Sequence, residues 1–142
     1  MQCNFLNKKI SVKIWGCCLV LLLSFLMLVS CDFDPYVGKR PIDYEASCWI
    51  SEGENYYIYY DTDSWENSYI EIDGEKKYSF CFLWSALDNR VNAYQDGNSG
   101  YADERLFVGE CEFGRNSFEM DIVEYYDDAL KALPEQLKFV RE

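Results

Sequence analysis

The residues best placed for chemistry in this chain form the tetrapeptide Leu28-Val29-Ser30-Cys31. Lysines at positions 8, 9 and 13 precede it, and the stretch Ile14–Ser30 is almost wholly apolar. A basic stretch, an apolar stretch and a small residue before a cysteine follow in the order of a lipoprotein signal peptide. We therefore expect cleavage after Ser30 and attachment of a diacylglyceryl group with palmitate-like chains to the Cys31 thiol.

An uncleaved membrane helix is the alternative interpretation of the same apolar stretch. A span needs about 20 apolar residues, and Ile14–Ser30 has 17. The short stretch and its end at Ser30-Cys31 favour the lipoprotein signal. Two acyl chains suffice for stable anchoring. Both interpretations predict attachment to the cell membrane, with the rest of the chain on the extracytoplasmic side.

The chain after Ser30 is small, acidic and rich in aromatic residues. It keeps 10 of the 13 basic residues and all 25 acidic residues, which gives a net charge of −15. Binding of nucleic acid needs a basic surface, so this charge argues against nucleic acid as a partner. Cationic partners and metal ions are the classes that it allows. Its 112 residues suffice for one domain.

Short stretches rich in aromatic and β-branched residues predict strands, because each is bounded by Gly, Asn, Asp or Ser. They are Ser47–Ser51, Tyr56–Asp61, Tyr69–Ile72, Lys77–Trp84, Arg90–Tyr94, Leu106–Phe113, Phe118–Tyr125 and Leu137–Arg141. One short helix is expected at 129–133, capped by Asp127 or Asp128 and ended by Pro134.

About eight strands joined mainly by tight turns predict an all-β fold. We expect a small antiparallel up-and-down barrel, with a barrel-like sandwich as the alternative. Closure also removes the exposed sheet edges of a chain this small. The expected organisation is a signal peptide at 1–30, a lipidated tether and entry segment at 31–46, and a β-barrel domain at 47–142.

The register of two hairpins can be predicted from which faces are apolar. A four-residue loop at 114–117 makes Phe113 face Phe118 and Cys111 face Met120 on one apolar side. A two-residue loop at Asp73-Gly74 would instead turn charged residues toward the core. We therefore expect an odd-length loop there, which pairs Ile70 with the aromatic residues at 78 or 80 and leaves positions 78, 80, 82 and 84 inward.

The first of these hairpins places four carboxylates on its other face. Glu112 lies opposite Glu119, and Glu110 lies opposite Asp121. Like charges directly opposite each other destabilise a sheet, so a cation site or a docking face for a basic partner is one interpretation. A solvated outer face is the other. In that case Lys138 or Arg90 would relieve the repulsion.

The densest aromatic stretch is Tyr56–Tyr60. Strand alternation places Tyr57 and Tyr59 on one face, opposite in direction to Ile58. We take Tyr57, Tyr59 and Trp84 as candidate ligand contacts, in a platform that stacks on a sugar or in the lining of a ligand mouth. Ordinary β-propensity and core packing are the alternative explanation.

No recognisable catalytic or metal-binding motif is present. The chain has no histidine, which excludes Ser-His-Asp and Cys-His arrangements. Cys48, Cys81 and Cys111 lack a CxxC spacing, so a zinc site is not expected. At most one disulfide could join these three cysteines, and buried free thiols are the favoured alternative. We expect a protein that is not an enzyme and holds no cofactor.

Several short segments resemble those of small cell-surface lipoproteins of Gram-positive bacteria. They are Arg40-Pro41-Ile42-Asp43-Tyr44, Trp49-Ile50-Ser51, Leu106-Phe107-Val108-Gly109 and Phe139-Val140-Arg141. The strand order also resembles that of lipocalin-like domains. The resemblance implies a surface lipoprotein with a β-barrel domain, and it implies no activity.

Two kinds of function are compatible with these expectations. The first is an extracytoplasmic, lipid-anchored binding module that holds a small apolar ligand inside an eight-stranded barrel. The second is an acidic interaction or inhibitor protein that docks a basic protein through its outer face. An open interior lined by aromatic residues would support the first, and a packed interior with a continuous acidic strip would support the second.

Overall fold

The computed structural model describes residues 38–95 and 104–142. The predicted signal peptide, its cleavage after Ser30, the lipid site at Cys31 and most of the loop after Gln95 lie outside the described residues. Within the two described ranges, no helix is long and apolar enough to cross a bilayer.

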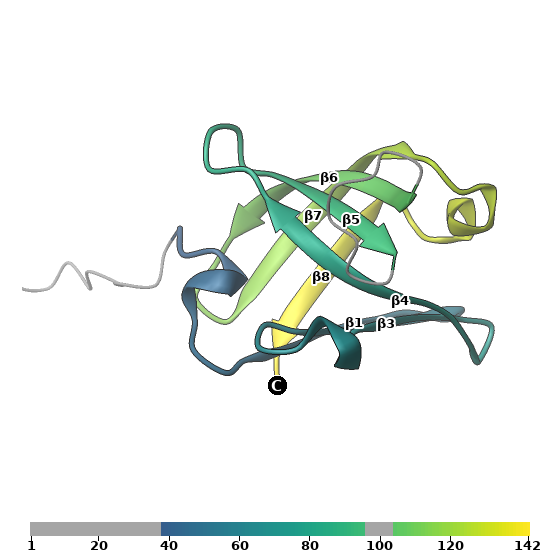
Figure 1. Ribbon diagram of the computed structural model, residues 1–142, viewed down its shortest axis with the longest axis horizontal. Helices are drawn as coiled ribbons and strands as arrows, with labels where there is room; N and C mark the ends of the chain where they lie inside the picture. The colour runs from purple at the N-terminus through teal and green to yellow at the C-terminus, as the bar shows by residue number, and fades with distance from the viewer. Residues whose placement is uncertain (1–37, 96–103) are drawn as a thin grey trace, which may run out of the picture. The chain divides into compact units, whose positions relative to one another are not determined.

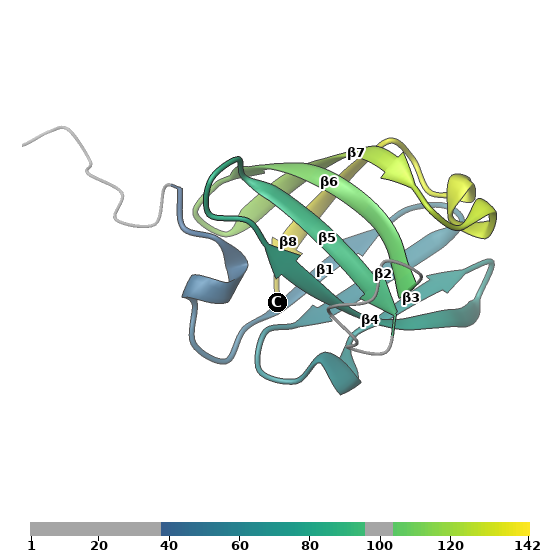
Figure 2. The ribbon, with the colours of Figure 1, turned by 45° about the horizontal axis from the view of Figure 1, so that its top comes forward.

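Eight antiparallel strands close into a barrel in which each strand pairs with its neighbours in sequence and β8 pairs with β1 (Figure 1). Figure 2 shows β5, β6 and β7 side by side, with β1 and β2 in the wall behind them. The strands are β1 (Cys48–Glu52), β2 (Tyr56–Asp61), β3 (Tyr69–Ile72), β4 (Glu75–Trp84), β5 (Arg90–Gln95), β6 (Arg105–Phe113), β7 (Ser117–Tyr125) and β8 (Gln136–Arg141). The predicted up-and-down barrel is confirmed, and every predicted strand is present.

The two ends of the barrel carry different segments. Because the strands alternate in direction, one end holds the start of β1, the end of β8 and the loops β2–β3, β4–β5 and β6–β7. We call it the entry end, since the described chain enters there (Figure 1). The short 3₁₀ turn η1 (Pro41–Asp43) lies at this end, where the Tyr44 hydroxyl donates to the Arg115 carbonyl at 2.7 Å. The other end is called the far end.

The β6–β7 hairpin has the predicted register. Phe113 lies opposite Phe118, and Cys111 lies opposite Met120. A bulge between Val108 and Gly109 then shifts the pairing. A Cβ atom at Gly109 would overlap the Met120 side chain, so glycine makes room for the methionine in the core.

The predicted odd-length loop between β3 and β4 is wrong. Asp73 and Gly74 form a two-residue turn with φ of 55° and 77°, the left-handed geometry that tight hairpins require. A bulge after Ile70 leaves Lys77 as the extra residue and pairs Ile70 with Tyr78. The parity of β4 is therefore restored within the strand rather than in the turn.

Large apolar side chains fill the interior of the barrel. The rings of Phe118 and Phe139 stack with centroids 4.4 Å apart and planes 7° from parallel. The Phe82 ring packs edge-on against those of Phe80, Phe107 and Phe139. The fully buried residues also include Trp49, Ile58, Ile70, Met120, Leu130 and Leu137. A small apolar ligand therefore has to compete with a packed core for the same space.

The predicted short helix is a 3₁₀ turn, η4 (Asp128–Ala132). The Asp127 carboxylate accepts a hydrogen bond from the Ala129 amide at 2.8 Å, and Pro134 follows the turn. Asp127, one of the two residues predicted to cap this segment, is thus the cap. A second such turn, η2 (Trp65–Asn67), precedes β3.

Candidate functional site

Tyrosine side chains gather on the outer face of β2 and β3. Ile58 and Tyr60 are buried in the core, so strand alternation turns Tyr57 and Tyr59 outward. Tyr69 of β3 lies opposite Tyr59. Its ring centroid is 5.7 Å from that of Tyr57 and also 5.7 Å from that of Tyr59. Two of the three predicted aromatic contacts therefore belong to one contiguous cluster.

The cluster extends sideways across the sheet through residues paired in direct register. Tyr59 lies opposite Ile50 of β1, and Ile50 lies opposite Val140 of β8. Val140 is 48% exposed. We call the outer face formed by Ile50, Tyr57, Tyr59, Tyr69 and Val140 the tyrosine wall. It presents apolar surface to solvent on the outside of a barrel whose inside is already filled.

Hydrogen bonding fixes one tyrosine of this wall. The Tyr59 hydroxyl donates to the Cys48 sulfur at 2.7 Å. This hydrogen bond, together with burial and nearby negative charge, raises the pKa of Tyr59 well above its ordinary value. Burial is the main cause of the raised pKa of Tyr57. Both rings are therefore neutral at physiological pH and suited to stacking on an apolar surface.

Polar groups border the tyrosine wall on the side of β4. The Lys76 ammonium lies 3.6 Å from the centre of the Tyr69 ring, a cation–π contact. A hollow of about 300 Å³ opens beside it and is lined by Glu66, Asn67, Tyr69, Lys76, Lys77, Tyr78 and Ser79. A second hollow, of about 330 Å³, borders Tyr57 and Glu71. Aromatic surface thus lies next to hydrogen-bond donors and acceptors, including charged groups of both signs.

Trp84, the third predicted aromatic contact, lies apart from this cluster. It ends β4 at the entry end, where its ring packs on those of Phe82, Phe113 and Phe118 at 5.5–5.8 Å. The side chain therefore belongs to the edge of the core. The tyrosine wall and Trp84 do not form one site.

The four predicted carboxylates do share one outer face, on β6 and β7. Glu110 lies opposite Asp121, and Glu112 lies opposite Glu119. We call these four residues the acidic wall. Its members keep the like-charge neighbours that the sequence predicted.

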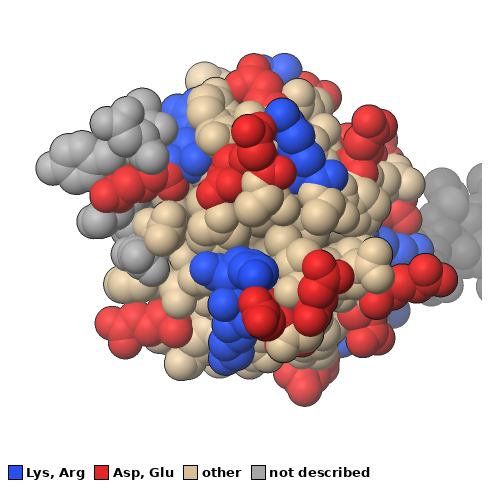
Figure 3. All heavy atoms as spheres, turned by 90° about the vertical axis from the view of Figure 1, so that its right-hand side faces the viewer, with Lys and Arg blue, Asp and Glu red and all other residues tan. Residues whose placement is uncertain are grey.

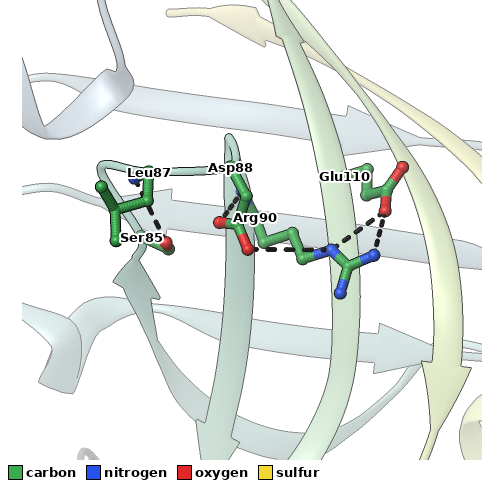
Figure 4. Close-up of polar contacts among 5 residues, drawn as sticks. All are labelled: Ser85, Leu87, Asp88, Arg90 and Glu110. Carbon is green, nitrogen blue, oxygen red and sulfur yellow. Dashed lines mark hydrogen bonds and ion pairs between the residues drawn. The ribbon is translucent and has the colours of Figure 1, made fainter.

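Neighbouring strands supply partners for three of the four carboxylates. Two guanidinium nitrogens of Arg90 lie 3.0 and 2.6 Å from one oxygen of Glu110 (Figure 4). Lys138 lies 3.2 Å from Glu119, and the Gln136 amide donates to Asp121 at 3.0 Å. Arg90 and Lys138 were the residues expected to relieve the repulsion, so the solvated-face interpretation gains support. In residues 38–95 and 104–142, no group of three or more Cys, Asp or Glu could hold a metal ion.

Charges of both signs also meet at the far end of the barrel. Figure 3 shows this end with Lys and Arg interspersed among Asp and Glu. Lys77 pairs with Glu75 at 2.7 Å, and Lys131 pairs with Asp128 at 2.7 Å. The negative net charge is therefore not gathered into a continuous acidic surface on this end.

The three cysteines after Cys31 are free thiols. They lie on β1, β4 and β6, which are not neighbours in the barrel. Burial raises the pKa of Cys111 to about 12 and also raises the pKa of Cys81. Thiolate is the nucleophilic form, so these two thiols are poor nucleophiles at neutral pH.

Sequence reasoning missed Tyr69 and Lys76. Tyr69 could have been found, because inward Ile70 and Ile72 require Tyr69 to point outward. Lys76 could not be placed, since its position opposite Glu71 depends on the bulge at Lys77. The hollow beside Tyr69 likewise exists only after η2 has folded against β4.

Comparisons with known proteins add no relative. No family model matches the chain, and neither a curated protein nor a solved structure is significantly similar to it. The closed eight-stranded barrel agrees with the lipocalin-like architecture implied by the sequence. The inference of function therefore rests on the geometry of the outer walls.

Proposed function

We propose that this protein is a lipid-anchored, extracytoplasmic binding module that recognises its ligand on the tyrosine wall rather than inside the barrel. One contrast carries the proposal: the interior is packed around the stacked rings of Phe118 and Phe139, whereas Tyr57, Tyr59 and Tyr69 form a contiguous aromatic surface outside. An eight-stranded barrel can hold one small ligand only when its interior is not filled by side chains.

The chemistry of the wall fits a neutral carbohydrate. Tyrosine rings offer a flat apolar surface for the C–H face of a sugar, and their hydroxyls offer hydrogen bonds. Lys76 and Asn67 in the adjoining hollow supply donors, while Glu66 and Glu71 supply acceptors. Recognition of this kind needs no catalytic group, so the module acts without enzymatic activity.

The anchor is the lipidated Cys31, reached after removal of residues 1–30. Two acyl chains would hold the module at the membrane stably. Its ligand would therefore be an extracytoplasmic glycan or a glycan fragment that reaches the cell surface.

An acidic interaction or inhibitor protein is the second candidate, supported by the net charge of −15 after cleavage and by the acidic wall. A basic protein would dock there by charge complementarity. However, Arg90 and Lys138 already partner two of the four carboxylates. A basic partner would have to displace them, which makes this surface weaker than the tyrosine wall as a recognition site.

Titration of the purified protein with neutral oligosaccharides tests the proposal, with tyrosine fluorescence and calorimetry as readouts. Saturable binding should fall at least about tenfold in Tyr59→Ala and in Tyr69→Ala, since each removes part of the stacking surface. Tyr126→Ala is the matched control, because Tyr126 is exposed, lies outside the wall and pairs with Arg105. Binding that survives both wall variants, or no binding to any oligosaccharide, would contradict the proposal.

A further inference from the structure

Leu87 is the most exposed large apolar residue of the described chain. It lies in the β4–β5 loop at the entry end, and the residue is 99% exposed. Ile42 of η1 lies at the same end and is 50% exposed. Figure 1 shows this loop and η1 at the end where the chain enters the barrel. Single exposed apolar residues are common, so exposure alone does not make Leu87 a contact site.

Hydrogen bonds within the loop and at its base brace the segment that presents Leu87 (Figure 4). The Ser85 amide donates to the Arg90 carbonyl at 2.8 Å and closes the base of the loop. The Arg90 amide donates to the Asp88 carboxylate at 3.2 Å, and the Asn89 carbonyl accepts from the Cys111 amide at 3.0 Å. Leu87 therefore projects from a hydrogen-bonded loop, which lowers the ordering cost of burying it against a partner.

Basic residues gather at the same end, around Tyr44. The Lys39 ammonium lies 5.9 Å and the Arg141 guanidinium 4.8 Å from the centre of the Tyr44 ring. The Tyr44 hydroxyl binds the Arg115 carbonyl, and Arg40 pairs with Asp43 at 3.2 Å. Four of the ten basic residues after Ser30 thus lie in one region of a strongly acidic chain.

The length of the tether limits how far this region can lie from the membrane. Six residues, 32–37, lie between Cys31 and Gly38, where the described chain begins, so seven Cα–Cα steps join the two. A chain spans at most about 3.6 Å per residue, so Gly38 lies within about 25 Å of the lipidated cysteine. The entry end is therefore the end of the barrel that the anchor holds near the lipid surface.

We infer that the entry end rests on the bilayer that holds Cys31, with Leu87 and Ile42 in the interfacial layer and the cations around Tyr44 against the lipid phosphates. This inference rests on the proposed lipid anchor. Acidic residues such as Glu45, Asp88 and Glu142 lie at the same end, so contact with zwitterionic lipid is expected rather than with an anionic surface. A lipid surface fits better than a protein partner because the short tether keeps this end within reach of the bilayer. The tyrosine wall lies on the side of the barrel and stays open to solvent.

Quenching by brominated lipid tests the orientation. The lipidated full chain is reconstituted into vesicles of brominated phosphatidylcholine and compared with Leu87→Trp and Glu54→Trp variants. Leu87 and Glu54 are both exposed loop residues, but Glu54 lies in the β1–β2 loop at the far end. After subtraction of the parent spectrum, the tryptophan added at position 87 should lose emission in brominated vesicles, and the one at position 54 should not.

The outcomes distinguish a wrong orientation from a missing lipid anchor. If the protein does not stay on the vesicles, the anchor of the proposed function fails and the inference fails with it. If the protein stays bound but position 87 is not quenched, or both positions are quenched equally, the orientation is wrong while the anchor stands. Shielding of position 87 from iodide only in whole cell membranes would indicate a protein partner and would also overturn the inference.

Discussion

The tyrosine wall and the acidic wall both lie on the outside of the barrel, but they differ in how many of their side chains have partners within the protein. On the acidic wall, Arg90, Lys138 and Gln136 of neighbouring strands partner three of the four carboxylates. On the tyrosine wall, the rings contact one another and Lys76, while Val140 remains about half exposed. The charged wall is thus largely satisfied within the protein, and the aromatic wall retains apolar surface that a ligand could cover.

This difference shows why composition alone misleads about the recognition surface. A net charge of −15 over residues 31–142 points to a basic partner. The contacts of individual carboxylates show how much of that charge is free to attract one. Surface ion pairs contribute little to stability, but each one places a cation on the wall that a basic partner would have to displace.

The largest expected effect is a loss of stability when the core between the two walls is truncated. Phe118→Ala should lower the free energy of unfolding by about 3–5 kcal/mol, because the side chain is only 1% exposed and stacks on Phe139. Urea denaturation measures the loss. A loss below about 1 kcal/mol would mean that the interior is loosely packed, and a ligand inside the barrel would again be a candidate.

A smaller effect concerns the tyrosine wall and its titration. The Cys48 sulfur is the main cause of the raised pKa of Tyr59, so Cys48→Ala should lower the pKa of Tyr59 toward that of an ordinary tyrosine. Absorbance of tyrosinate during an alkaline titration measures this change. If the variant titrates like the parent, the hydrogen bond to Cys48 does not raise the pKa of Tyr59.

The same hydrogen bond makes stability depend on alkaline pH. The pKa of Tyr59 is raised in the folded state, so the unfolded chain loses this proton first as the pH rises. The contribution of Tyr59 is complete below its unfolded pKa of 10.0 and is lost as the pH rises through the folded value. The fall in melting temperature above about pH 10 should be shallower in Tyr59→Phe than in the parent.

The acidic wall predicts opposite signs for two neighbouring substitutions. Glu112→Gln should be neutral or stabilise the protein by a few tenths of a kcal/mol, because it removes the like charge facing Glu119. Glu110→Gln is the matched control and should destabilise by about 0.2–1 kcal/mol, since it weakens the pair with Arg90. Thermal denaturation of both variants distinguishes the two cases. Damage by Glu112→Gln as large as that of Phe118→Ala would show that the register is wrong.

The smallest expected effect is that of a reducing agent on the melting temperature. Cys48, Cys81 and Cys111 are free thiols on strands that do not pair with one another. Thiol counting on the denatured protein, after the proposed cleavage and lipidation at Cys31, should find three thiols, and a reducing agent should leave the melting temperature unchanged. One thiol, with a melting temperature that falls on reduction, would mean that a disulfide supports the barrel.

Local patterns in the sequence determined the strands, their order and the β6–β7 register. Alternation along a strand has a period of two, so inward Phe118, Met120 and Ile122 fix the outward Glu119 and Asp121 without any tertiary information. The same locality located the cap at Asp127 or Asp128 and the stop at Pro134. These features depend only on residues a few positions apart or on the two arms of one hairpin.

Closure of the barrel decided the rest. The bulge at Lys77 replaced the expected odd-length loop, because the two-residue turn is favoured locally and β4 had to recover its inward face further along. Packing of opposite walls filled the interior, and pairing of strands distant in sequence brought Val140 beside Ile50. It also set Lys138 beside Glu119. Such contacts depend on how all eight strands tilt and close together, which no single stretch of sequence encodes.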